Sequence, residues 1–195
     1  MARLRTFIAV ALDAAVHARV VALQETLGRS GAEVKWVEPD NIHVTLLFLG
    51  EVEDRDINEV CRAVTESCVE PTGFVLGVGT VGAFPNLRRP RTLWVGVTDG
   101  LQELVALHDA LEKVLLELGC YRREDRAYTP HITLGRVRSE RTDDRLVQAL
   151  TKQAGWQGGQ MPVREVLVMS SELTPKGPVY SVLSRAKLHG DDQTG

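Results

Sequence analysis

Two stretches, "NIHVTLLFLG" at residues 41–50 and "TPHITLGRV" at residues 129–137, carry most of the information in this sequence. Each contains a run of β-branched and aliphatic residues led by a histidine, a composition that favours a strand. In both, a threonine stands two positions after the histidine, and the residues between and after them are aliphatic. The sequence therefore predicts two similar strands, each with a polar pair set into an otherwise apolar run.

The alternation of side chains along a strand sorts each pattern into two faces. His43 and Thr45 point to one face and Val44 to the other, so the imidazole and the hydroxyl lie about 7 Å apart. His131 and Thr133 form the same pair in the second stretch. From composition, roughly 0.07 copies of this four-residue pattern are expected by chance in such a chain. A purely structural alternative is two half-buried histidines that are hydrogen-bonded to neighbouring strands.

The bulk composition is that of an ordinary globular protein. The chain has 195 residues, 44% hydrophobic and 25% charged, which suffices for the core of one domain or of two packed halves. The formal net charge of −3 excludes a protein that is basic overall, so any contact with nucleic acid must be local. Cys61, Cys68 and Cys120 have no metal-ligand spacing, and the first two are expected to pack inward from a helix.

The N-terminal segment "MARLRTFIAVALDAAVHARV" begins with basic residues and continues with apolar ones, as a signal peptide does. Asp13 and His17 interrupt the apolar run, however, and amphipathic spacing continues beyond it. No apolar run in the chain approaches the length of a membrane span. We therefore expect a reduced, cytoplasmic protein that does not enter a membrane.

Hydrophobic periodicity, capping residues and glycine or proline breaks predict an α+β protein in which strands and helices alternate. Strands are expected at residues 5–12, 34–37, 43–50, 74–84, 92–97, 131–137, 163–173 and 179–188, the last two as a hairpin. Helices are expected after the N-cap Asp13 to Leu27, and at residues 54–68, 100–119 and 142–153. Gly50 is expected to end its strand, residues 155–162 to form a loop, and residues 189–195 to form a frayed tail. The order strand, helix, His-x-Thr strand, helix occurs twice, which suggests a loose duplication with one copy in each half of the chain.

Two imidazoles and two hydroxyls suit phosphoryl transfer without a metal. Imidazole titrates near neutral pH, so one ring can accept a proton while the other donates one. Threonine hydroxyls can donate hydrogen bonds to the non-bridging oxygens of a phosphate and stabilise its developing charge. A metal site is the competing interpretation, but no carboxylate or cysteine on these strand faces completes a ligand set. Nucleophilic serine or cysteine catalysis lacks its characteristic turn motif.

The paired tetrads "HVTL" at 43–46 and "HITL" at 131–134 resemble the signature of the 2H phosphoesterase superfamily. Further segments resemble one branch of it, the RNA 2′,3′-cyclic phosphodiesterases, which are also called 2′-5′ RNA ligases. Those segments are "RTFIAVAL", "HVTLLFLGEV", "PRTLWVGV", "YTPHITLGRV" and "SSELTPKGPVYSVL". They occur in order over nearly the whole chain, so the resemblance is more specific than either tetrad alone.

The resemblance implies both a fold and a reaction. The fold is bilobal, a single domain over residues 1–195 with two pseudo-duplicated lobes of antiparallel sheet, helices outside, and one tetrad from each lobe facing a central cleft. The reaction is hydrolysis of an RNA 2′,3′-cyclic phosphate to a 2′-phosphomonoester, with neither a metal nor a cofactor. In this scheme His43 is the proton donor to the departing 3′-oxygen and His131 is the base that activates water. Thr45 and Thr133 then bind the phosphate.

Three further residues are candidates for binding the substrate. Arg136 stands three positions after Thr133, where the resembling family often has a basic residue, and it can either reach a phosphate or lie exposed at the end of the strand. Phe48 and Tyr180 can stack a nucleobase, since unpaired bases favour aromatic surfaces, although core packing is the first expectation for Phe48.

Other basic and aromatic residues are left with two interpretations each. Arg88, Arg89 and Arg91, on the loop "NLRRPR", either are simply solvated or steer an RNA backbone. Trp36 and Trp94 either pack in the core, which is the first expectation, or stack a base. No role is assigned to His17, His108 and His189.

Two classes of function remain. The first is a metal-free cyclic phosphodiesterase, a monomer acting on RNA with a 2′,3′-cyclic phosphate end, tRNA fragments among the candidates. The same residues would catalyse the reverse joining of such an end to a 5′-hydroxyl, because a catalyst accelerates both directions. The second class is a non-catalytic protein that binds RNA ends or nucleotides in the same cleft. Two intact tetrads favour the enzyme, because binding alone does not need two titrating groups.

Overall fold

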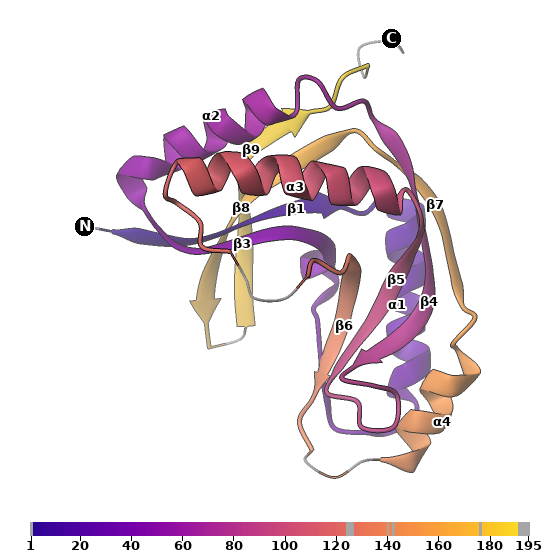
Figure 1. Ribbon diagram of the computed structural model, residues 1–195. Coiled ribbons are helices and arrows are strands. Elements are labelled where there is room, and N and C mark those ends of the chain that lie inside the picture. Colours follow the sequence, from indigo (N-terminus) through magenta and orange to yellow (C-terminus); the bar gives the residue numbers. More distant parts are fainter. Residues whose placement is uncertain (1, 124–126, 140, 142, 176, 191–195) are drawn as a thin grey trace.

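The computed structural model describes residues 2–123, 127–139, 141, 143–175 and 177–190 (Figure 1). Its strands are β1 (Arg3–Ala11), β2 (Val34–Trp36), β3 (His43–Glu53), β4 (Phe74–Phe84), β5 (Thr92–Asp99), β6 (His131–Val137), β7 (Gln157–Val163), β8 (Glu165–Thr174) and β9 (Gly177–Lys187). Its α-helices are α1 (Ala14–Gly28), α2 (Ile57–Ser67), α3 (Leu101–Glu117) and α4 (Asp144–Lys152), and short 3₁₀ turns occupy Pro39–Asn41 and Asp54–Asp56. The expected α+β class is confirmed.

The strands form one antiparallel sheet ordered β7-β4-β5-β6-β3-β1-β8-β9, with β2 paired to β6. Within the described residues, β3 and β6 meet through a single register pair, Val44 with Ile132. By contrast, β1 with β3 and β8 with β9 share long ladders. The sheet therefore divides at this pair into two lobes. We call β3, β1, β8 and β9 the first lobe, and β7, β4, β5, β6 and β2 the second lobe.

Helices cover both lobes, and some of them pack on the lobe opposite to the strand that precedes them in the chain. α2 and α3 pack on the first lobe, where α2 contacts β8 and β9 and α3 contacts β3 (Figure 1). α1 and α4 pack on the second lobe, against β7 and β4 respectively. α1 follows β1 of the first lobe yet packs on the second, and α3 follows β5 of the second lobe yet packs on the first. The repeated order of elements is present, but the lobes are interleaved rather than consecutive halves of the chain.

The apolar positions of both tetrads lie in the core, as alternation requires. Val44, Ile132 and Leu134 are fully buried, and Leu46 is nearly so. Because these side chains fill the interior, the histidines and threonines of the same strands are left on the opposite face. The core therefore fixes which face of each strand carries the histidine and the threonine.

Several local predictions agree closely with the structure. β4 and β6 have the predicted bounds. Asp13 caps α1, because its carboxylate accepts a hydrogen bond from the backbone N–H of Val16 at 2.7 Å. Cys68 is fully buried, and Cys61 is partly buried against the core. Short-range signals were sufficient for these elements.

Gly50 does not end its strand. It has a φ of 74°, and β3 continues beyond it to Glu53 while staying paired with β1. Glycine adopts this left-handed conformation at little cost, so the strand is displaced locally and keeps its partner.

The loop expected at residues 155–162 is largely a strand. β7 pairs with β4 from Gln157 onward. Its glycines lie within the strand, where they allow neighbouring groups to approach closely, and do not form a turn. A side chain at Gly158 would collide with the ring of Trp156, and Gly159 has a φ of 94°. Pro162 is tolerated because β7 lies at the edge of the sheet.

The tail expected to fray begins at His189, and residues 191–195 of it lie outside the described residues. The backbone N–H of His189 donates to Pro71 O at 2.8 Å, and its carbonyl accepts from the N–H of Gly73 at 3.1 Å. The chain is therefore anchored through this residue. Among the described residues, no helix is long and apolar enough to cross a membrane.

The junction of the lobes gives a prediction about stability. Ile132→Ala should lower the free energy of unfolding by about 2–5 kcal/mol, because it leaves a cavity where the two lobes meet. Leu173→Ala is the matched control, since that side chain is 68% exposed on β8, and it should change stability by no more than about 0.5 kcal/mol. Denaturant unfolding followed by circular dichroism measures both. Equal losses from the two variants would contradict a core role for the junction.

Candidate active site

The two tetrad histidines are held in the same way. The Nδ1 atom of His43 lies 2.7 Å from Asn41 O, and the Nδ1 atom of His131 lies 2.7 Å from Thr129 O. A carbonyl oxygen only accepts hydrogen bonds, so Nδ1 carries the proton in both rings. The Nε2 atom is therefore the nitrogen that gains or loses a proton in each case. Each acceptor stands two residues before its histidine, where the chain enters the strand.

The surroundings of the two rings differ. His43 Nε2 lies 2.8 Å from the hydroxyl of Thr45, and the ring is 5.0 Å from that of Phe7 and 5.6 Å from that of Tyr180. Burial lowers the pKa of His43, and its hydrogen bond to the Asn41 carbonyl partly offsets this effect. His131 meets Phe84 edge-on at 5.2 Å. The two tetrads, which are nearly alike in sequence, thus place their histidines in different environments.

A cavity of about 240 Å³ lies between the lobes and takes its walls from both. His43, Thr45 and Phe48 line it from the first lobe, and Thr133 and Arg136 from the second. Its remaining lining residues are Lys35, Trp36, Val37, Glu38, Asn41, Gly177, Pro178 and Tyr180. His131 is not among them, but alternation along β6 places it on the same face as Thr133. The structure thus brings three tetrad side chains directly to one cavity and places the fourth beside them.

The candidate binding residues also meet at this cavity. Tyr180 and Arg136, the two residues proposed from the sequence to bind the substrate by stacking and by charge, both lie in its wall. Phe48 does not pack in the core, which was the first expectation; it is 54% exposed and lines the cavity. It occupies this position because β3 shifts its register against β1 before Phe48, which turns the ring out of the interior. Trp36 lines the cavity as well and packs partly against the core.

Asn41 is a residue of the site that sequence reasoning missed. Its backbone carbonyl holds His43, and its buried side chain donates from Nδ2 to Pro178 O at 2.8 Å. Pro178 belongs to the hairpin of β8 and β9, which is 137 residues away in the chain. Asn41 therefore ties the hairpin that carries Tyr180 to the strand that carries the first tetrad. Its place directly before a strand was visible in the sequence, but its distant partner was not.

Tyr128 is a second residue that the sequence did not reveal. Its hydroxyl donates to the carbonyl of Thr45 at 2.9 Å, which joins the segment before the second tetrad to the backbone of the first. Its ring stacks on His108 of α3, with centroids 4.0 Å apart and planes 4° from parallel. Burial raises the pKa of the Tyr128 hydroxyl, so it stays protonated and remains a donor. His108, which had no assigned role, supports this contact.

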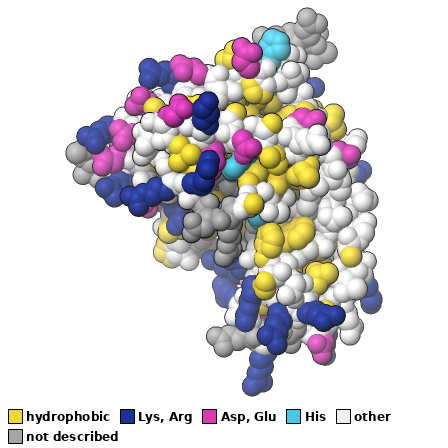
Figure 2. Space-filling view, viewed as in Figure 1, with side chains coloured by type: hydrophobic (Ala, Val, Ile, Leu, Met, Phe, Trp, Pro, Cys, Tyr) yellow, Lys and Arg dark blue, Asp and Glu magenta, His cyan; other side chains and the backbone are white. Residues whose placement is uncertain are grey.

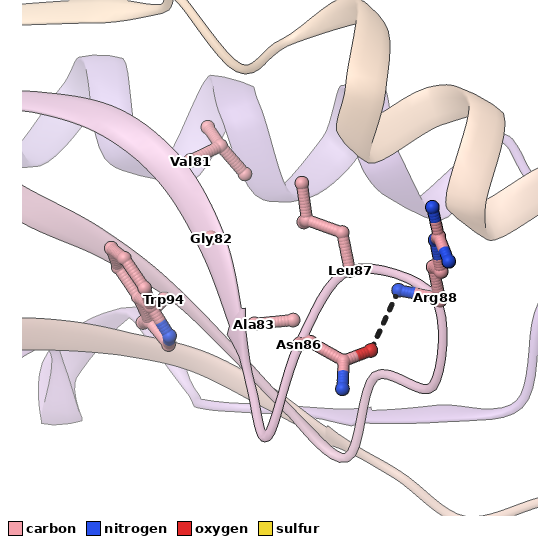
Figure 3. Close-up of a pocket in the computed structure, with 7 residues that line it drawn as sticks. All are labelled: Val81, Gly82, Ala83, Asn86, Leu87, Arg88 and Trp94. Carbon is pink, nitrogen blue, oxygen red and sulfur yellow. Dashed lines mark hydrogen bonds between the residues drawn. The ribbon is translucent and has the colours of Figure 1, made fainter.

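A second hollow lies away from the tetrads, where β4 and β5 meet the loop that joins them (Figure 3). It is lined by Val81, Gly82, Ala83, Asn86, Leu87, Arg88 and Trp94. Trp94 is partly buried and packs against Phe84 at 5.3 Å, while the amide of Asn86 accepts hydrogen bonds from the N–H groups of Arg88 and Arg89. The tetrad residues lie outside this lining, so we do not place the chemistry there.

Basic side chains collect over the end of the second lobe, below β6 (Figure 2). Arg136 pairs in register with Lys35 on one side and Thr92 on the other, so the end of β6 and the loop before β5 meet here. Arg91 donates from Nη1 to Ser139 O at 2.7 Å, while Arg88 and Arg89 are exposed on the loop. A chain with a net charge of −3 therefore has a local basic surface beside its cavity.

Three or more metal-ligating side chains do not come together anywhere in the described part of the chain. The tetrad strands offer two imidazoles and two hydroxyls, which are hydrogen-bonding and proton-transferring groups.

A sequence profile described as the 2′-5′ RNA ligase superfamily matches residues 12–174, a span that includes both tetrads. The chain belongs to that superfamily. Its resemblance to the RNA 2′,3′-cyclic phosphodiesterase branch is supported by relatives that carry this name. The relative from Archaeoglobus fulgidus is 38% identical over 92% of this chain and 98% of its own length. The relative from Methanothermobacter thermautotrophicus is 35% identical over 92% of this chain and 96% of its own length.

Solved structures share this fold. The protein TT0787 of Thermus thermophilus superposes with a TM-score of 0.80 at 29% identity, covering 96% of this chain and 99% of that one. LigT of E. coli, complexed with 3′-AMP, superposes with a TM-score of 0.77 at 24% identity over 96% of this chain and 99% of its own. The bilobal 2H phosphoesterase-like fold expected from the sequence is thereby confirmed.

The Tyr128 contact yields a testable prediction. Tyr128→Phe keeps the stack on His108 but removes the donor to Thr45 O, so the two tetrads lose one of the contacts that hold them in place relative to each other. We expect kcat to fall about tenfold with KM nearly unchanged, since small misplacements of reacting groups are costly. Steady-state kinetics on a 2′,3′-cyclic phosphate substrate measures this. His108→Phe, which retains an aromatic stack and the hydroxyl, is the control; a loss of kcat in it equal to that of Tyr128→Phe would contradict the assignment.

Proposed function

We propose that this protein hydrolyses RNA 2′,3′-cyclic phosphate ends to 2′-phosphomonoesters, using two histidines and no metal. The observation that carries the proposal is the matched orientation of the tetrads. In each, Nδ1 is committed to a backbone carbonyl, which leaves Nε2 for proton transfer beside a threonine of the same face. The names of the relatives, RNA 2′,3′-cyclic phosphodiesterases, support the same substrate.

The proposed chemistry needs one proton acceptor and one proton donor on opposite sides of the phosphorus. His131 Nε2 takes a proton from water as the oxygen attacks phosphorus. The bond from phosphorus to the 3′-oxygen breaks, and His43 Nε2 supplies the proton that makes this oxygen a hydroxyl. Thr45 and Thr133 donate to the non-bridging oxygens, where charge develops. The products are a 2′-phosphomonoester and a free 3′-hydroxyl.

The lowered pKa of His43 affects its proposed role as the donor. In the empty cavity burial favours the neutral ring, whereas a donor must be protonated. A bound phosphodiester brings a negative charge next to Nε2, which favours the protonated form. Binding of the substrate thus favours protonation of His43, and the ring is charged chiefly when substrate is present. Arg136, in the cavity wall, adds a permanent positive charge that favours binding of the anionic RNA end.

The proposed substrate is an RNA end, with tRNA fragments among the candidates, and the proposed state is a cytoplasmic monomer. Phe48 and Tyr180, which line the cavity, supply aromatic surface for the terminal base. The same groups would join a cyclic end to a 5′-hydroxyl by the reverse reaction, but the high concentration of water favours hydrolysis. The alternative is an RNA-end-binding protein without turnover. The fixed Nδ1 atoms favour the enzyme, because orienting both Nε2 atoms serves proton transfer.

Turnover in a chelator tests the function directly. A short RNA with a 2′,3′-cyclic end should be hydrolysed at an unchanged rate in excess EDTA, because side chains supply every catalytic group in the proposed mechanism. Phosphorus NMR of the product should show a 2′-monophosphate and no 3′-monophosphate. Loss of activity in EDTA that returns on adding a divalent metal would refute the mechanism. Tight binding of the RNA without turnover would favour the binding protein.

The pH dependence follows from one neutral and one protonated histidine. We expect a bell-shaped kcat/KM profile whose alkaline limb lies below the ordinary imidazole pKa of about 6.5, because burial lowers the pKa of the donor His43 in the free protein. Because bound phosphate raises the pKa of His43, the alkaline limb of kcat should lie at higher pH than that of kcat/KM. His43→Ala and His131→Ala should each cost about 10²–10⁴-fold, and each should remove one limb from the residual activity. A rate that rises steadily to alkaline pH would instead indicate attack by hydroxide.

A further inference from the structure

Three strands of the first lobe place Arg5, Ser171 and Tyr180 in one row. Arg5 pairs in register with Ser171 across β1 and β8, and Ser171 pairs with Tyr180 across β8 and β9. Residues paired in this way share a face of the sheet. It is the cavity face, because the Phe7 ring, two positions after Arg5, lies 5.0 Å from the His43 ring and 4.8 Å from the Tyr180 ring. The row therefore extends from the cavity wall across the open surface of the first lobe.

Positive charge reaches Tyr180 from both lobes. Arg5 acts on it along the row, and Arg136 acts on it from the opposite wall of the cavity. Burial raises the pKa of the Tyr180 hydroxyl, and these two charges partly offset that rise, so the hydroxyl remains a donor. Among the described residues neither arginine forms an ion pair, although Glu51 stands opposite Arg5 on β3. Within this part of the chain, two exposed cations thus lie near one hydroxyl, and neither cation is held in an ion pair.

We propose that Arg5 and Tyr180, with Arg136 opposite, form a second phosphate subsite that binds the phosphodiester on the 5′ side of the terminal nucleotide. The inference rests on the proposed function, which places the cyclic phosphate at the tetrads. The Tyr180 ring meets the His43 ring at 5.6 Å, so the subsite adjoins the first tetrad. The nearest anion covalently attached to the reacting nucleotide is its own 5′-phosphate. Guanidinium groups bind phosphate through paired N–H donors, and the tyrosine hydroxyl adds another.

The subsite predicts a preference among substrates. Adenosine 2′,3′-cyclic phosphate and the same nucleotide carrying a 5′-phosphate react at an identical bond and differ only in the second anion. For the wild-type protein, kcat/KM should be about tenfold or more higher for the 5′-phosphorylated substrate, the usual scale of one charge-assisted hydrogen-bonded contact. The preference should decline with added salt, because the subsite is exposed.

Variants that each remove one positive charge show which residue causes the preference for the 5′-phosphorylated substrate. Arg5→Gln should bring the ratio of the two kcat/KM values close to one. Arg3→Gln is the matched control: Arg3 lies two residues earlier on β1, is exposed and pairs with Glu53 at 3.6 Å, so its removal should leave the ratio unchanged. A wild-type ratio near one would overturn the subsite. So would a fall in Arg5→Gln that is equal for both substrates, or an equal loss of the ratio in Arg3→Gln.

A binding measurement separates this inference from the proposed function. Calorimetric titration compares adenosine 2′-monophosphate with adenosine 2′,5′-bisphosphate, neither of which can turn over. The bisphosphate should bind about tenfold more tightly to the wild-type protein and to Arg3→Gln, but not to Arg5→Gln. If neither cyclic substrate is hydrolysed and this difference persists, the proposed function fails and the subsite stands. Equal affinities for the two nucleotides would overturn the subsite even in an active enzyme.

Discussion

The contact between Val44 and Ile132 is the constraint on which the site depends. It is the one register pair that joins β3 to β6 in the described structure, and each residue is the second position of its tetrad. Pairing these positions sets the two histidines and the two threonines in a fixed relation across the junction. A slip of one residue would turn either tetrad toward the core and bury its imidazole. The burial of both side chains therefore stabilises the fold and at the same time fixes the register of the tetrad histidines and threonines.

Elements outside the junction also hold the two lobes together. α1 and α3 each pack on the lobe opposite the strand they follow, so neither lobe is completed by a continuous segment of chain. Tyr128 adds a polar link across the junction, from the segment before the second tetrad to Thr45, while Asn41 ties the hairpin of β8 and β9 to the first tetrad within the first lobe. Relative motion of the lobes would break buried contacts on both sides, which favours a cleft of defined width.

The sequence was informative where structure follows from short-range signals. The bounds of β4 and β6, the Asp13 cap and the faces of both tetrads came from alternation and capping, which involve neighbouring residues. Where a residue's role depends on a partner far along the chain, that role could not be predicted from the sequence. Asn41 and Tyr128 act through Pro178 and Thr45, which are 137 and 83 positions away. The strand β7 was missed for a related reason, since its glycines fit a close neighbour that periodicity does not reveal.

The distribution of charge fits the proposed recognition of an RNA end better than a general affinity for RNA. A protein with a net charge of −3 does not attract polyanions as a whole, so its field must be positive where the substrate enters. Here Arg136 lines the cavity and Arg5 lies in the row that leads to Tyr180 in the cavity wall, so cations of both lobes lie near the site although the net charge is negative. Such an arrangement favours a strand that inserts its end, because only the terminal phosphates reach the convergent charges. Internal stretches of RNA would meet the two arginines without reaching the tetrads, and would gain little from them at physiological salt.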